Sequence, residues 1–147
     1  MTARRVDEVR LVVPSRIESL AVINAVAEEV AQQLDFDEET RNAITISVVE
    51  AGTNAIQHGN REDSSKPTEV VFRTEEGKLV IVIRDQGAGF DPSAVGSPIE
   101  GEQLFAEHGR GVHILRSFMD EVSWRFDGGT ECCLVKYLPS SVRPLRG

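Results

Sequence analysis

Residues 50–58 have the sequence Glu-Ala-Gly-Thr-Asn-Ala-Ile-Gln-His. Glu50, Asn54 and His58 are spaced four residues apart, so on a helix all three project from one side. An Asn carbonyl oxygen is a hard ligand suited to Mg²⁺, and a Glu one turn away can accept a proton from an attacking hydroxyl. On spacing alone, the alternative is a solvent-exposed polar helix face, with His58 capping or packing at the helix end.

The helix that carries this stretch is predicted to begin after Asp37, which can act as its N-cap, and to stop near His58-Gly59. An earlier helix is predicted directly after the first strand. Ser15 and Glu18 form a capping-box pattern there, and the helix runs to about Leu34. Its apolar face is predicted from the helical spacing of Ile17, Leu20, Ala21, Asn24, Ala27, Ala31 and Leu34.

Alternating apolar residues predict the strands of a sheet. These strands are expected at residues 6–13, 70–73, 79–84, 122–126 and 130–138. The second and third form a hairpin, and the last is less regular because Lys136 shares a face with Leu134. Residues 60–67 are predicted to be a polar loop, and residues 86–108 a long loop with at most one short helical piece. A third helix is expected to start near Gly111.

The size and charge of the chain limit its possible functions. With 147 residues and 40% hydrophobic content it fits one domain over residues 1–147, in which about 139–147 form a flexible tail. The net charge of −8 and the absence of a basic patch argue against direct nucleic-acid binding. No apolar run approaches the length of a membrane span. Cys132 and Cys133 are adjacent and would point to opposite faces of a strand, so they should not pair, and a reducing, cytoplasmic location is expected.

Two glycine-containing motifs suggest a ligand site. Asp85-Gln86-Gly87-Ala88-Gly89 lies where a buried strand runs into the long loop, and its acid can accept a hydrogen bond from an amine such as that of adenine. Gly109-Arg110-Gly111 lies at the start of the third helix, where free backbone N–H groups favour phosphate. Each motif also has an ordinary interpretation: a glycine-rich turn after a strand, and a helix entry turn with Arg110 in solvent.

The order of these motifs resembles that of the GHKL ATPases, and within them the anti-sigma serine kinases. Residues 50–58 resemble the N-box in its version ending Asn-Ala-x-x-His, and residues 85–92 resemble the first glycine box. Residues 109–112 resemble the second glycine box, and Gly129-Thr130 resembles the closing Gly-Thr element. Val112 departs from the Leu, Met or Phe that is more frequent in the family. The resemblance covers about Leu11 to Leu138 and implies an α+β sandwich of the Bergerat type, with three helices on one face of a mainly antiparallel sheet.

The resemblance also implies roles for individual residues. Asn54 would bind Mg²⁺, and Glu50 would be the base toward a partner's hydroxyl. Asp85 would hold the adenine amino group, with Thr130 helping nearby. The remaining site residues would be Gly87 and Gly89, which shape the nucleotide pocket, Gly109, Arg110 and Gly111, which hold phosphates, and 86–108, which form the ATP lid.

The function implied by the resemblance is that of an anti-sigma factor. It would transfer the γ-phosphate of ATP, with Mg²⁺, to a Ser or Thr of an anti-anti-sigma antagonist of the STAS type, and it would sequester a sigma factor by partner switching. A homodimer is expected by analogy. The leading alternative is a nucleotide-binding regulatory module that sequesters its partner without kinase turnover. A detached histidine-kinase catalytic domain fits less well, because residues 1–35 predict a strand and one helix rather than a helical hairpin with a phospho-acceptor His.

Overall fold

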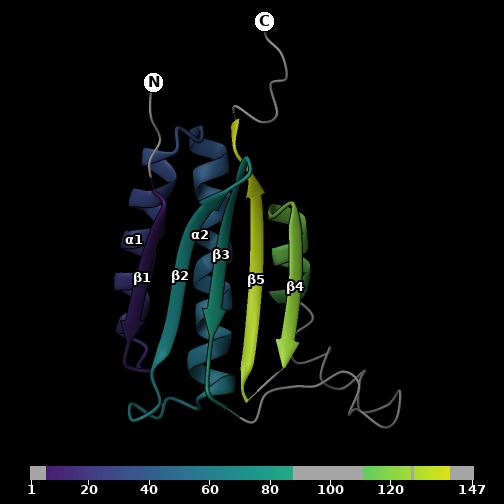
Figure 1. Cartoon of the computed structure of the whole chain (residues 1–147). Helices are drawn as coiled ribbons and strands as arrows, with labels where there is room; N and C mark the ends of the chain where they lie inside the picture. Colours follow the sequence, from purple (N-terminus) through teal and green to yellow (C-terminus); the bar gives the residue numbers. More distant parts are fainter. Residues whose placement is uncertain (1–5, 88–110, 127, 140–147) are drawn as a thin grey trace, which may run out of the picture.

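The centre of the fold is a five-stranded antiparallel sheet with the strand order β1-β2-β3-β5-β4. The computed structural model describes residues 6–87, 111–126 and 128–139. Its strands are β1 (Glu8–Val13), β2 (Thr68–Glu75), β3 (Lys78–Arg84), β4 (Glu121–Phe126) and β5 (Thr130–Tyr137). One face of the sheet is covered by α1 (Ser19–Gln33), α2 (Glu38–Thr53) and a helix over residues 111–118 (Figure 1). The predicted α+β sandwich is therefore confirmed.

The second helix follows its predicted course but changes its geometry near the end. Asp37 caps α2 as predicted, since its carboxylate accepts a hydrogen bond from the Thr40 N–H at 2.8 Å. After Thr53 the helix continues as a π-helix, η1 (Asn54–Gly59), a geometry that the sequence did not predict. A π turn holds more residues than an α turn, so the four-residue spacing no longer keeps His58 in line with Glu50. The His58 side chain is exposed.

The predicted start of the first helix is wrong. Helix α1 begins at Ser19, and its N-cap, Glu18, makes no capping bond with its side chain. The Ser15 hydroxyl is buried and instead forms a hydrogen bond with Thr68 Oγ1 at 2.8 Å, so it is not available to a helix terminus. The predicted apolar face is also partly wrong, because Ile17 is exposed. The buried apolar residues of this segment are Ile23, Ala27, Val30, Ala31 and Leu34.

The hairpin and the last strand agree with the predictions. Glu76 and Gly77, which join β2 to β3, have φ values of 45° and 76°, as a two-residue hairpin turn requires. Lys136, which interrupts the apolar face of β5, donates a hydrogen bond from Nζ to the Phe118 carbonyl at 2.6 Å. The amine therefore satisfies the carboxyl end of the helix over residues 111–118, and this contact explains why a lysine is tolerated there.

The two cysteines lie on opposite sides of β5, as predicted, and both are free thiols. Cys132 belongs to the core between the sheet and the helices, and burial raises its pKa to about 12. Cys133 packs against the valines of the outer face. Neither thiol is placed to form a bond with the other. Within the described ranges, no helix is long and apolar enough to cross a membrane.

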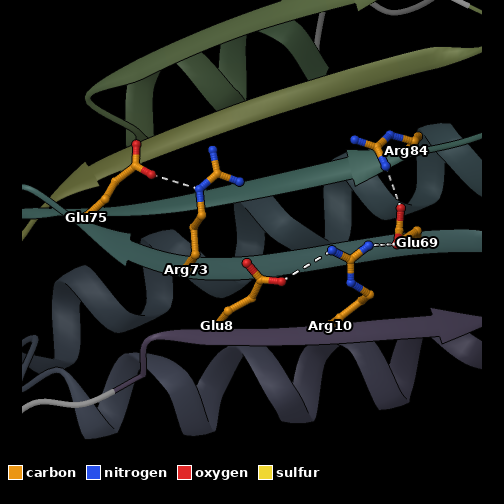
Figure 2. Close-up of polar contacts among 6 residues, drawn as sticks. All are labelled: Glu8, Arg10, Glu69, Arg73, Glu75 and Arg84. Atoms are coloured by element: carbon orange, nitrogen blue, oxygen red, sulfur yellow. Dashed lines mark hydrogen bonds and ion pairs between the residues drawn. The ribbon is translucent and has the colours of Figure 1, made fainter.

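The face of the sheet away from the helices has an apolar centre and a charged border. Val71, Val80, Val82 and Val135 form a small buried cluster there. On one side of it, the Glu69 carboxylate pairs with both Arg10 and Arg84, so that β1, β2 and β3 are linked by charge (Figure 2). Exposed ion pairs of this kind contribute little stability each. Their long side chains nevertheless help to keep the valines out of water.

Replacing Ile81 by Ala tests the position of the core. Ile81 lies on β3 with 0% of its surface exposed, so we expect the free energy of unfolding to fall by about 2 to 5 kcal/mol because a cavity is left. Val12→Ala, at a side chain that is 58% exposed, should change it by less than about 0.5 kcal/mol. Urea denaturation followed by circular dichroism measures both. Equal losses for the two variants would contradict this core.

Candidate functional site

Asp85 is a buried carboxylate just beyond the end of β3. Its side chain is 5% exposed, and its Oδ1 accepts hydrogen bonds from the Gly87 N–H at 2.9 Å and the Thr130 N–H at 3.2 Å. The Asp85 N–H donates to the Thr130 carbonyl at 2.9 Å, which continues the pairing of β3 with β5. Burial raises the pKa of Asp85 above its usual value, and the two N–H donors act in the opposite direction.

Glycines from three segments allow the backbone to approach this carboxylate closely. A Cβ on Gly59 would overlap the Asp85 carboxylate, and a Cβ on Gly129 would overlap the Asp85 carbonyl oxygen. A Cβ on Gly87 would overlap the carbonyl oxygen of Gly59. The end of η1, the residues after β3 and the turn before β5 therefore meet at Asp85, in an arrangement that side chains would prevent.

Glu50 contacts the helix over residues 111–118. Gly111, the first described residue of this helix, is buried, and a Cβ added to it would overlap the Glu50 carboxylate. The first N–H groups of a helix have no partner within the helix and carry partial positive charge. The Glu50 carboxylate is thus brought against a second helix that is distant in the sequence, near the place where the sequence predicts the anion-binding start of that helix.

Asn54 lies between these two regions. It is half-buried and is the first residue of η1, one turn after Glu50. Gly59 lies nine positions after Glu50, a length of at most roughly 13 Å at the rise of an α-helix. The Glu50 carboxylate and Gly111 therefore lie at one end of this segment and the buried Asp85 at the other. Asn54 lies between them.

The described part of the chain contains most of the predicted site. Glu50, Asn54, Asp85, Gly87, Gly111 and Thr130 lie in it, at the places given above. Gly89, Gly109 and Arg110, together with residues 88–108 of the predicted lid, lie outside the described residues. Among those that are described, no group of three or more His, Cys, Asp or Glu side chains is placed to hold a metal ion. Asn54 remains the candidate metal ligand that the sequence suggested.

Sequence reasoning missed two residues, Gly59 and Asn60. Gly59 was treated only as a helix stop, and Asn60 only as the first residue of a polar loop. In the structure Gly59 packs against the Asp85 carboxylate, and the buried Asn60 carboxamide accepts a hydrogen bond from the Gln86 N–H at 2.8 Å. The only signal in the sequence was their position directly after the 50–58 stretch, and spacing does not distinguish a packing glycine from one that ends a helix.

Comparison with known proteins places this geometry in a family. The family described as "Histidine kinase-like ATPase domain" matches residues 13–136. The chain is 28% identical over 141 residues to the serine-protein kinase RsbW of Bacillus licheniformis, covering 92% of this chain and 88% of that protein. It is 27% identical over 143 residues to the serine-protein kinase RsbW of Bacillus cereus (strain ATCC 10987 / NRS 248), covering 91% and 87%.

A solved structure supports the fold independently. The crystal structure of the RsbU and RsbW domains of Rv1364c from Mycobacterium tuberculosis superimposes with a TM-score of 0.66 at 16% identity. The match covers 89% of this chain and 32% of that longer one, and at this identity it bears on the fold alone. The family match spans both the segment with Glu50 and Asn54 and the segment with Asp85 and Thr130. The chain therefore belongs to the family of histidine kinase-like ATPase domains.

Proposed function

We propose that this chain is an ATP-dependent kinase that phosphorylates a Ser or Thr of a partner protein. The observation that carries the proposal is the contact of the Glu50 carboxylate with Gly111, near which the sequence predicts the start of the third helix. Helix starts favour phosphate groups, and a carboxylate beside one can take a proton from a hydroxyl that attacks there. The similarity to serine-protein kinases supports the same chemistry.

Asp85 is the proposed adenine-binding residue. Within the part of the chain that the structure describes, both hydrogen bonds to its carboxylate go to Oδ1, and Oδ2 accepts none of them. Oδ2 can therefore accept a hydrogen bond from the exocyclic amine of adenine. Gly59, Gly87 and Gly129 let the backbone pack closely around this acid and hold it in place. Thr130, whose N–H already bonds the acid, helps to fix its orientation.

The phosphate end of the site lies nearer Glu50. Asn54 supplies one hard oxygen, which suits Mg²⁺ because this ion keeps several waters and takes other ligands from nucleotide phosphates. The bound Mg²⁺ would neutralise phosphate charge during transfer. Gly109, Arg110 and Gly111 are the proposed phosphate-binding residues, Gly89 is the proposed second glycine of the pocket wall, and residues 86–108 are the proposed lid.

In the proposed transfer step, this chain takes up one proton. The partner's hydroxyl oxygen forms a bond to the γ-phosphorus, the bond from that phosphorus to the β,γ-bridging oxygen breaks, and ADP leaves with the electron pair. The hydroxyl proton passes to the Glu50 carboxylate. Glu50 is half-buried on α2, which holds the carboxylate in place while leaving it open to a partner.

The partners that we propose follow from the resemblance to anti-sigma serine kinases. The phosphorylated partner is an anti-anti-sigma protein of the STAS type, and the sequestered partner is a sigma factor, with the chain acting in the cytoplasm as a homodimer. The competing function is sequestration with nucleotide as a conformational ligand only. Glu50 beside Gly111 favours the kinase, because a pure binding module has no need of a base at that place.

Glu50→Gln separates nucleotide binding from phosphate transfer. The amide keeps the size of the side chain but cannot take a proton, so we expect transfer to slow by roughly 100-fold or more while the ATP affinity changes by less than about 3-fold. Transfer is measured with γ-labelled ATP and STAS-type proteins of the same organism, and binding by calorimetry. Glu39→Gln, in the exposed first turn of the same helix, is the matched control. A wild type that binds ATP but phosphorylates none of these proteins would favour the sequestering module.

Asp85→Asn should weaken the binding of adenine nucleotides and alter the pH dependence of the free energy of unfolding. The new amide keeps an oxygen for Gly87 and Thr130 but presents an N–H₂ group where Oδ2 stood, so ATP affinity should fall roughly 10- to 100-fold. Because burial raises the pKa of Asp85 above 3.8, the native state holds its proton more tightly than the unfolded chain. This contribution to stability is present at low pH and is lost as the pH rises through the native pKa.

The pH effect is measured by urea denaturation between about pH 4 and about pH 7. We expect the wild type to lose stability relative to Asp85→Asn as the pH rises, since the asparagine carries no titrating proton. Glu28→Gln, at an exposed position of α1, serves as control for a changed net charge. A wild type that gains stability relative to Asp85→Asn over this range would show that hydrogen bonding outweighs burial at Asp85.

A further inference from the structure

Asn60 links the region around Asp85 to the rest of the fold. Its side chain is 1% exposed, and the two N–H groups of Nδ2 have four acceptors within reach: Ser15 Oγ at 2.9 Å, the carbonyls of Lys66 and Pro67 at 3.1 Å, and Thr68 Oγ1 at 3.3 Å. These acceptors come from the connection between β1 and α1, from the loop before β2, and from the first residue of β2. The nitrogen side of the carboxamide is therefore anchored on three segments of the fold.

The oxygen side of the same carboxamide faces the candidate site. Asn60 Oδ1 accepts the hydrogen bond from the Gln86 N–H at 2.8 Å. Gln86 lies beyond the end of β3, which stops at Arg84, and here a side chain takes the place of a neighbouring strand as acceptor. The peptide that joins Asp85 to Gln86 is consequently held by the hydrogen bond to Asn60. The Asp85 N–H is held by its hydrogen bond to the Thr130 carbonyl.

The backbone on both sides of Asp85 is thus fixed by different elements. The residue before Asn60, Gly59, also lies against the Asp85 carboxylate. If the Gln86 peptide turned, the Asp85 carboxylate would turn with it, because only hydrogen bonds and packing hold the chain after the last residue of β3. A small rotation would change where Oδ2 points without unfolding the domain.

We propose that Asn60 is a positioning residue that sets the direction of the Asp85 carboxylate and so determines the selectivity for adenine. The role rests on the proposed function, since it needs Asp85 to bind the base. Asn60 does not touch the nucleotide in this proposal. It acts through the Gln86 peptide, and its anchoring to Ser15, Lys66 and Thr68 makes it rigid enough to do so.

The test is the ratio of affinities for ADP and IDP. The base of IDP has a carbonyl oxygen where adenine has its amine. A correctly oriented Asp85 carboxylate therefore accepts a hydrogen bond from the amine of ADP and repels the carbonyl oxygen of IDP. A site built to bond one polar group rejects the analogue that lacks it, and we expect the wild type to prefer ADP by more than about 10-fold. Asn60→Ala should reduce this ratio by about 5-fold or more. Both nucleotides are titrated into the same protein preparation by calorimetry, so that any unfolded fraction affects both affinities equally and cancels from their ratio.

Leu79→Ala is the control for lost stability. It leaves a void in the core near the other end of β3 and lowers stability, but it touches none of the hydrogen bonds of Asn60. Its ADP-to-IDP ratio should stay within about 2-fold of the wild type. If Asn60→Ala does not fold, Asn60→Ser is used. The serine side chain is also too short for its oxygen to reach the Gln86 N–H, and it leaves a smaller void.

The outcomes distinguish this inference from the proposed function. A wild type that binds ADP and IDP equally would overturn the adenine role of Asp85, and the role of Asn60 with it. A selective wild type whose ratio is unchanged in both Asn60 variants would overturn the positioning role alone. Amide hydrogen exchange gives a readout without nucleotide: the Gln86 N–H should be protected in the wild type and in Leu79→Ala, and unprotected exchange in the wild type would contradict the contact itself.

Discussion

The arrangement of the site depends on how the chain accommodates a buried carboxylate at Asp85. Removing this charge from water is unfavourable, and the raised pKa reflects that cost. Two N–H groups, from Gly87 and Thr130, offset part of it, but they reach the carboxylate only because the backbone comes very close. Close approach in turn requires glycine at 59, 87 and 129. One electrostatic requirement therefore accounts for the meeting of three segments and for the residue type at three positions.

The end of the second helix is organised by the same requirement. Gly59 closes η1 against Asp85, and directly after it the Asn60 N–H bonds to the Ala55 carbonyl, five residues back, at 2.8 Å. The Asn60 side chain then joins the helix end to the start of β2 and to Gln86. The helix thus ends in a network of hydrogen bonds, and the geometry of this network is transmitted to the site.

The elements themselves could be predicted from the sequence, because each depends on local patterns. Alternating apolar residues predicted β4 and the two strands of the hairpin, and Asp37 as N-cap predicted the start of α2. The start of α1 could not be predicted, because the Ser15 hydroxyl bonds to Thr68, a partner 53 residues away. The same holds for Asn60 and Gly59, whose partners Gln86 and Asp85 lie just beyond the end of β3, 26 residues further along the chain. Local patterns place residues on elements, whereas the contacts between elements that form the site depend on the assembled fold.

The two ends of the site are supported by different parts of the molecule. Asp85 is held by β3, β5 and the end of η1, whereas Gly111 belongs to a short helix with its own anchors. That helix is fixed at its carboxyl end by the bond from Lys136 to the Phe118 carbonyl and by the buried Leu115 and Met119. The proposed base recognition and the proposed phosphate placement therefore rest on separate supports. Under the proposed function, a change at the helix over residues 111–118 would end phosphate transfer while adenine binding persists, so a kinase and a nucleotide-dependent sequestering module would share one fold and differ at the contact between Glu50 and Gly111.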